Sequence, residues 1–174
     1  MLTKIDLCSR ALLKLGEAPI TSFSEDTAAA KIAAELCDIT LDALLCLHPW
    51  GFAAKRIVLQ KTTDGFFAMP SDILRIMECD AKFEVAGNKI FSKADKIEIA
   101  AIARANPENF PPHFAMLAAT RLAMEFCVPL TGDRNAFALL NAMWESELRQ
   151  AKFIDAAGRP AGAIKNFSLI ETRF

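Results

Sequence analysis

The segment LLCLHPWGFAAKR, residues 44–56, marks the point where the helical spacing of apolar residues ends. Proline disfavours helical geometry in the residue before it, so Pro49 predicts a helix that stops at about His48. Trp50 and Phe52 offer large apolar faces that can fill a junction between helices and strands. We therefore interpret His48, Pro49, Trp50 and Phe52 as a structural corner, in which His48 has a capping or packing role rather than a catalytic one.

Helical periodicity flanks this corner on both sides. Apolar residues recur every three or four positions in four segments, namely residues 4–15, 25–48, 113–128 and 134–157. Thr3 predicts a capping box at the first start, and Ser24, followed by two acids, predicts the second start. Pro129 and Gly132 are expected to end the third helix, and Asp133 is expected to cap the fourth.

The pattern between the second and third helices is that of short strands. The expected strands are residues 57–59, 74–79, 83–85 and 89–91. The last two are joined by Gly87-Asn88, a two-residue turn of the kind that closes a β-hairpin. Residues 97–102 fit either a further strand or a short helix, because the alanines that follow suit both.

These elements predict an α+β fold that is mainly α, with about four helices in a bundle and a small inserted antiparallel β lobe. At 174 residues the chain is most simply one domain with such an insertion. We divide it into N-terminal helices (residues 1–55), the β lobe (56–105), C-terminal helices (106–157) and an extended tail (158–174).

The tail carries three basic residues, one acidic residue and several large apolar ones. Such a terminus is usually mobile unless a partner binds it, yet this one is too apolar to stand idle in solvent. We therefore expect its large apolar and basic residues to bind a partner: Arg159, Ile164, Lys165, Phe167, Leu169, Ile170, Arg173 and Phe174.

Composition favours some classes of function over others. The net charge of −1 gives no global electrostatic reason to expect nucleic-acid binding. Five scattered cysteines without a CxxC motif suggest buried free thiols in a reducing compartment. No signal peptide is recognisable, and no apolar run approaches the roughly 18 residues of a membrane span, so we expect no membrane association.

The sequence contains no recognisable catalytic residues, metal site or cofactor motif. The chain has only two histidines, and His113 is expected at the surface. Lys55 and Arg56 are read as a solvated face that discourages pairing at a strand edge. A small enzyme remains the alternative, and a cleft that brings together His48, a carboxylate and Arg56 would favour it.

Four stretches in a fixed order carry a resemblance to a known family: ALLKLGEAPITSFSEDTAAAKIAAELCDITLDALLCLHPWGFAAKR, MPSDILRIMEC, VAGNKIFS and LAATRLAMEFCVPLTGD. Together they resemble the head-to-tail adaptor (connector) proteins of tailed bacteriophages and gene transfer agents, the group of tail tubular protein A. The resemblance runs from about Leu7 to about Ala151. Gly51 departs from it, because an asparagine is expected there, and the expected tyrosines of the hairpin region are absent.

The resemblance implies a structural protein of the virion rather than an enzyme. Such subunits are made in the bacterial cytoplasm and form a ring, twelve-fold in the families considered, at the junction of capsid and tail. The expected partners are the portal protein, neighbouring adaptor subunits and a tail or stopper protein. DNA is expected to pass through the ring without sequence-specific binding.

Overall fold

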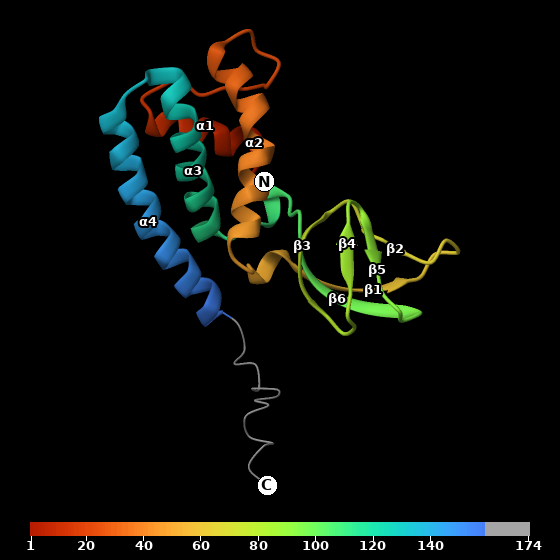
Figure 1. Cartoon of the computed structure of the whole chain (residues 1–174). Coiled ribbons are helices and arrows are strands. Elements are labelled where there is room, and N and C mark those ends of the chain that lie inside the picture. Colours follow the sequence, from red (N-terminus) through yellow and green to blue (C-terminus); the bar gives the residue numbers. More distant parts are fainter. Residues whose placement is uncertain (159–174) are drawn as a thin grey trace.

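The computed structural model describes residues 1–158 (Figure 1). Its helices are α1 (Lys4–Lys14), α2 (Ala28–Leu47), α3 (Pro112–Thr131) and α4 (Arg134–Ala157). Its strands are β1 (Ala54–Gln60), β2 (Phe67–Ala68), β3 (Ile73–Cys79), β4 (Glu84–Ala86), β5 (Lys89–Phe91) and β6 (Lys96–Ala103). Short 3₁₀ turns lie at Gly51–Ala53 and Pro107–Asn109. The α+β class is therefore confirmed, and every strand described lies between α2 and α3.

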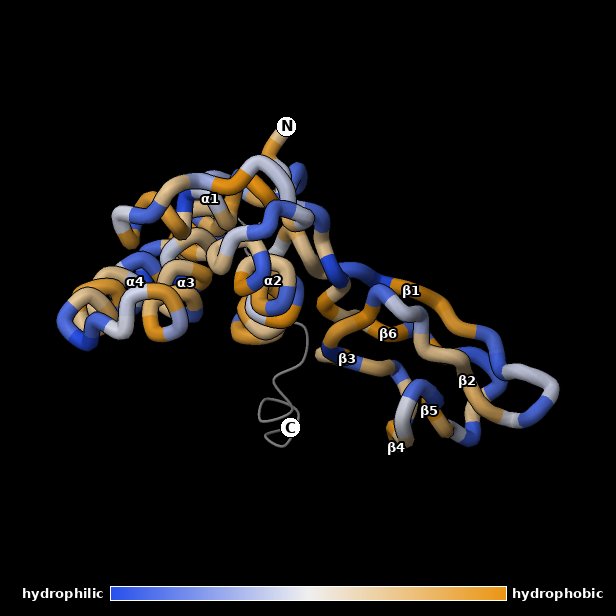
Figure 2. Tube along the Cα trace, turned by 90° about the horizontal axis from the view of Figure 1, so that it is seen from above, coloured by the Kyte–Doolittle hydropathy of each residue, from blue (hydrophilic) through white to orange (hydrophobic). Residues whose placement is uncertain are grey.

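Helix α3 is the centre of the helical part. It packs against α1, α2 and α4, and its side chains Phe114, Leu117 and Phe126 are completely buried. Viewed from above, α3 stands between α2 and α4, while α1 lies across one side of this row (Figure 2). The expected bundle of four helices is not confirmed, because only α2, α3 and α4 run side by side.

The apolar character of α3 corrects the expectation that no stretch of the chain is apolar enough to resemble a membrane span. Among residues 1–158 it is the one helix whose length and composition would allow a membrane span. However, 61% of its most apolar stretch is buried inside the protein. Contact with three other helices accounts for that composition, as it does in the core helix of any globular domain.

The start of α2 differs from the prediction. Ser24 is not the N-cap; Thr27 is, and its side chain accepts a hydrogen bond from the Ala30 amide at 3.1 Å. Glu25, the acid after Ser24, does not interact with the helix start. Its Oε1 atom accepts hydrogen bonds from the Thr21 hydroxyl and amide. These bonds lower the pKa of Glu25 and hold residues 21–25 in a turn, so the helix begins three residues later.

The other helix ends agree better with the sequence. Thr3 and Asp6 form the expected capping box, and Asp133 caps α4 by accepting bonds from two amides. Pro129 does not end α3 but lies within its last turn, and its missing N–H leaves one helical hydrogen bond unmade. The helix ends at Gly132, whose φ of 62° lies in the left-handed region that favours glycine.

The β lobe consists of two antiparallel sheets of three strands each, in the orders β1-β6-β3 and β2-β5-β4. A second apolar core lies inside it, with Phe67, Ile90, Ile97 and Ile99 completely buried. Residues 97–102 belong to strand β6, which resolves the ambiguity left by the sequence. Both faces of β6 are used, because Ile99 enters the lobe core while Ile102 enters the helical core.

Alanine substitutions of Thr27 and Ser24 test which residue caps the start of α2. Thr27→Ala should lower the free energy of unfolding by about 1 kcal/mol, because the Ala30 amide loses its partner. Ser24→Ala should change it by less than about 0.5 kcal/mol, because Ser24 is exposed and outside the helix. Urea unfolding measures both, and a larger loss for Ser24→Ala would contradict the observed cap.

Candidate functional site

The corner predicted from residues 44–56 exists and joins the helices to the β lobe. Helix α2 ends at His48, whose backbone is extended with φ −144° and ψ 148°. The Trp50 amide donates to the His48 carbonyl at 2.8 Å, and β1 begins four residues later at Ala54. Trp50 is fully buried, and its indole Nε1 donates to the Leu44 carbonyl at 3.0 Å. This bond satisfies a carbonyl that the helix end leaves free.

An aromatic cluster fills the inside of the corner. Phe114 at the start of α3 contacts Trp50, Phe52 and Phe110, with ring centroids 4.9, 4.8 and 4.7 Å away. All three pairs are edge-to-face, the arrangement that aromatic quadrupoles favour. Trp50 and Phe52 therefore fill the junction as predicted, and they fix the start of α3 as well as the end of α2.

Asp155 in the last turn of α4 closes the corner from the other side. Its Oδ1 accepts a hydrogen bond from the Gly51 amide at 2.8 Å, and its Oδ2 lies 3.3 Å from His48 Nε2. The Asp155 side chain is only 7% exposed. Sequence reasoning missed this residue. An acid in the last helical turn opposes the helix dipole, and that conflict is the signal that could have pointed to a specific partner.

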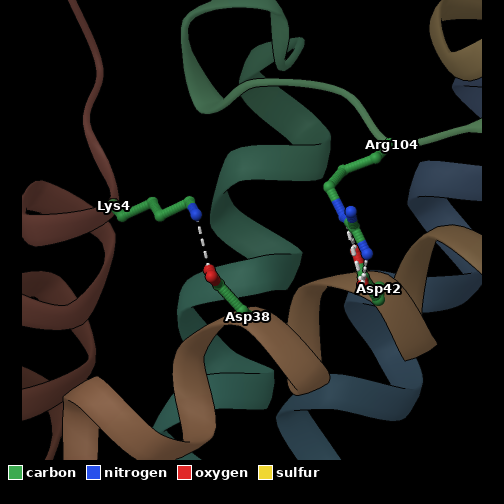
Figure 3. A network of polar contacts seen from close by, with 4 residues as sticks. All are labelled: Lys4, Asp38, Asp42 and Arg104. Carbon is green, nitrogen blue, oxygen red and sulfur yellow. Dashed lines mark hydrogen bonds and ion pairs between the residues drawn. The ribbon is translucent and has the colours of Figure 1, made fainter. Parts of the chain in front are cut away.

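The root of the lobe is also tied to α2 by charged side chains. Arg104, just after β6, binds Asp42 through two nitrogens, with Nε 2.9 Å from Oδ1 (Figure 3). One turn earlier on α2, Asp38 pairs with Lys4 at 2.6 Å (Figure 3). Arg75 of β3 donates to the Cys46 carbonyl at 3.0 Å. The C-terminal half of α2 thus holds contacts from α1, β3 and the chain after β6.

The cationic pair Lys55 and Arg56 is exposed on β1, an edge strand, as the sequence predicted. Lys55 lies 2.9 Å from Asp72 and lowers the pKa of that carboxyl group, and Arg56 lies 3.6 Å from Glu98. Both cations line a cleft of 560 Å³ next to Pro49. His48 is not among the residues that line this cleft, so the grouping that would favour an enzyme is not found there.

A larger cleft of 1140 Å³ lies in the β lobe. It is lined by residues 79–84, residues 91–94 and Gly65, and its apolar lining includes Phe83 and Phe91. Phe83 and Phe91 are 38% and 42% exposed. Neither the cleft nor these aromatics were singled out from the sequence. The walls of the cleft flank the β4–β5 hairpin, and the exposure of Phe83 and Phe91 follows from how that hairpin packs.

Metal-binding side chains do not gather within residues 1–158, where no group of three or more His, Cys, Asp or Glu residues could hold an ion. His113 is half-buried rather than at the surface, and its Nε2 atom is buried at the start of α3. The eight tail residues predicted to bind a partner, from Arg159 to Phe174, lie outside the described residues, so that assignment stays a prediction.

No protein-family model matches the sequence, and no curated protein matches it.

Substitutions of Trp50 test how much its packing and its hydrogen bond stabilise the corner. Trp50→Ala should lower the free energy of unfolding by about 3–5 kcal/mol through the cavity it leaves. Trp50→Phe keeps most of the packing but leaves the Leu44 carbonyl unpaired, at a cost of about 1–3 kcal/mol.

Trp144→Phe is the matched control, because the Trp144 Nε1 atom has no hydrogen-bond partner among residues 1–158. In urea unfolding it should be the mildest of the three exchanges. A Trp144→Phe protein less stable than Trp50→Phe would contradict the role given to the indole of Trp50.

Proposed function

We propose that this chain is a subunit of a head-to-tail adaptor of a tailed bacteriophage or gene transfer agent, located at the capsid–tail junction of the particle. Its subunits form a ring below the portal, extend the DNA channel and present a platform for the tail or a stopper protein. The four helices act as one rigid bundle-like body in this ring. The chain performs no reaction and needs no cofactor.

The observation that carries this proposal is an uncharged strip on the outer side of α4. Leu139, Met143, Ser146, Gln150 and Phe153 follow one another at steps of four, three, four and three. Leu139 is 64% exposed and Phe153 is 74% exposed. The solvent side of a surface helix normally carries charges, so an outer side without them needs a partner to cover it.

Helix α2 carries a second strip with the same spacing: Ile32, Leu36, Ile39, Ala43 and Cys46. Ile39 is 67% exposed, while Ile32 and Leu36 are half-buried and pack in part against the helical core. A step pattern of four and three is the spacing with which one helix packs along another. Each strip spans 15 residues, and the helix rises by about 21 Å from its first residue to its last.

The positions of the two strips on the subunit are compatible with a ring. Helices α2 and α4 lie on opposite sides of α3 (Figure 2). If α4 of one subunit packs on α2 of the next, every contact uses two different surfaces. Such heterologous contacts generate rings when the rotation closes. An interface this narrow is also consistent with weak association of free subunits and with assembly on the portal as a template.

The size of the purified chain, measured with and without a portal ring, tests the proposed function. The free chain should be a monomer or a weak oligomer, and the portal should recruit several copies into one complex. A chain that stays separate from portal rings at all concentrations would overturn the proposal.

Charges placed on the α4 strip test its role. Leu139→Asp with Phe153→Asp should weaken assembly on the portal by about tenfold or more, because two carboxylates would be buried without partners. The matched control, Ala138→Asp with Arg149→Gln, changes the net charge equally but on exposed positions outside the strip. Equal assembly of the two variants, measured by light scattering, would remove α4 from the interface.

A further inference from the structure

Two cysteine side chains meet in the contact between α1 and α2. Cys8 on α1 is completely buried, and Cys37 on α2 is only 2% exposed. A hydrogen bond joins the two side chains, and Cys8 is the donor. Both cysteines are free thiols in this structure. Because a disulfide requires two cysteines that already face each other at short range, this pair has the arrangement from which one can form.

Small side chains on α2 explain why the two helices come so close. Ala30 and Ala33 precede Cys37 at steps of three and four, so the three residues lie on one face of α2. All three are buried in the helical core. The distance between packed helices depends on the size of the side chains at their contact, so this face lets α1 approach closely.

An ion pair at the rim of the contact holds the two cysteines in place. Lys4 on α1 lies 2.6 Å from Asp38 on α2 (Figure 3). Lys4 is one helical turn before Cys8, and Asp38 directly follows Cys37. The ion pair therefore fixes α1 against α2 at the level of the thiols.

The two thiols differ in acidity. The hydrogen bond from Cys8 lowers the pKa of Cys37, and the Lys4 ammonium adds to this effect. The same bond, together with burial, raises the pKa of Cys8. Cys37 thus gives up its proton first and is the nucleophile of the pair, while Cys8 keeps its proton and is placed to resolve an oxidised Cys37.

We propose that Cys8 and Cys37 form a redox site that hydrogen peroxide converts into a disulfide bond between α1 and α2. The Cys37 thiolate attacks one peroxide oxygen and becomes a sulfenic acid, and the hydroxide that leaves takes up the proton that Cys37 had lost. The Cys8 sulfur then attacks the Cys37 sulfur, the S–O bond breaks, and water leaves with the Cys8 proton. Two thiols and one peroxide thus give one disulfide and two water molecules.

Burial determines both how the disulfide forms and how long it lasts. Peroxide reaches the thiols only when the contact between α1 and α2 opens locally, and a reductant needs the same opening to break the bond. The biological consequence rests on the proposed function. A subunit made in a reducing cytoplasm keeps both thiols, and a particle released from the cell meets conditions in which a disulfide persists. The bond then fastens α1 to α2.

Peroxide treatment of the purified full-length protein, followed by mass spectrometry of an unreduced digest, tests the site. The peptides that contain Cys8 and Cys37 should be linked, and the intact mass should fall by two hydrogen atoms. Cys8→Ser should lose the link and leave Cys37 as a sulfenic acid that a selective reagent traps. The matched control is Cys127→Ser, because Cys127 is also buried but bonds to Thr131 and Asp133, and it should keep the link.

Oxidation of the half-buried Cys46 and Cys79 without a link between Cys8 and Cys37 would overturn the proposal. The linked wild type should also melt about 5 °C or more above the reduced protein, because the bond restricts the unfolded chain. An unchanged or lower melting temperature would contradict a bond across the native contact.

Both measurements use the free chain, so they are independent of the portal. Linked protein that portal rings do not recruit would sink the proposed function alone. Recruited protein in which Cys8 and Cys37 never link would sink the redox site alone.

Discussion

Burial of Trp50 is the constraint on which the rest of the structure depends. The indole is fully enclosed and satisfies the Leu44 carbonyl, so α2 has to end where Pro49 ends it. The same ring contacts Phe114 and thereby fixes the start of α3. Asp155 then binds the adjacent Gly51 amide, which fixes the end of α4. Trp50 and the adjacent Gly51 thus set the relative positions of three helices and of the lobe that begins at Ala54.

This arrangement has a consequence for function. Polar side chains within residues 1–158 largely serve the structure itself: they cap helices, close turns and tie the lobe to α2. Large apolar side chains nevertheless remain exposed, namely Ile39 on α2, Leu139 and Phe153 on α4, and Phe83 and Phe91 at the lobe cleft. Exposed apolar side chains are suited to contact with other chains. The proposed role in assembly rests on these side chains.

Much of the fold could be predicted, because helical periodicity and proline positions are local signals. The corner and the capping box of Thr3 follow directly from neighbouring residues. The predicted start of α2 and the predicted end of α3 were wrong, because the residues used as signals there have other roles in the structure. Glu25 next to Ser24 supports a turn instead of a cap, and α3 continues past Pro129 to Gly132. Strand β2, with two residues, is too short to produce a pattern.

The candidate site was less predictable, because its groups come from distant parts of the chain. Asp155 meets Gly51 across 104 positions, and no spacing rule connects them. The sequence predicted a helix over residues 134–157, while the outer strip at Leu139 and Phe153 became evident only once their exposure was known. Exposure is a property of the packed molecule, so interaction surfaces are the last feature that a sequence pattern reveals.

The most direct test of this account is an electron cryomicroscopy map of the chain mixed with portal rings. The account predicts a closed ring of subunits below the portal, with the outer side of α4 in one subunit facing the outer side of α2 in the next. A map in which portal rings carry no such layer, or in which both helices face solvent throughout, would contradict it.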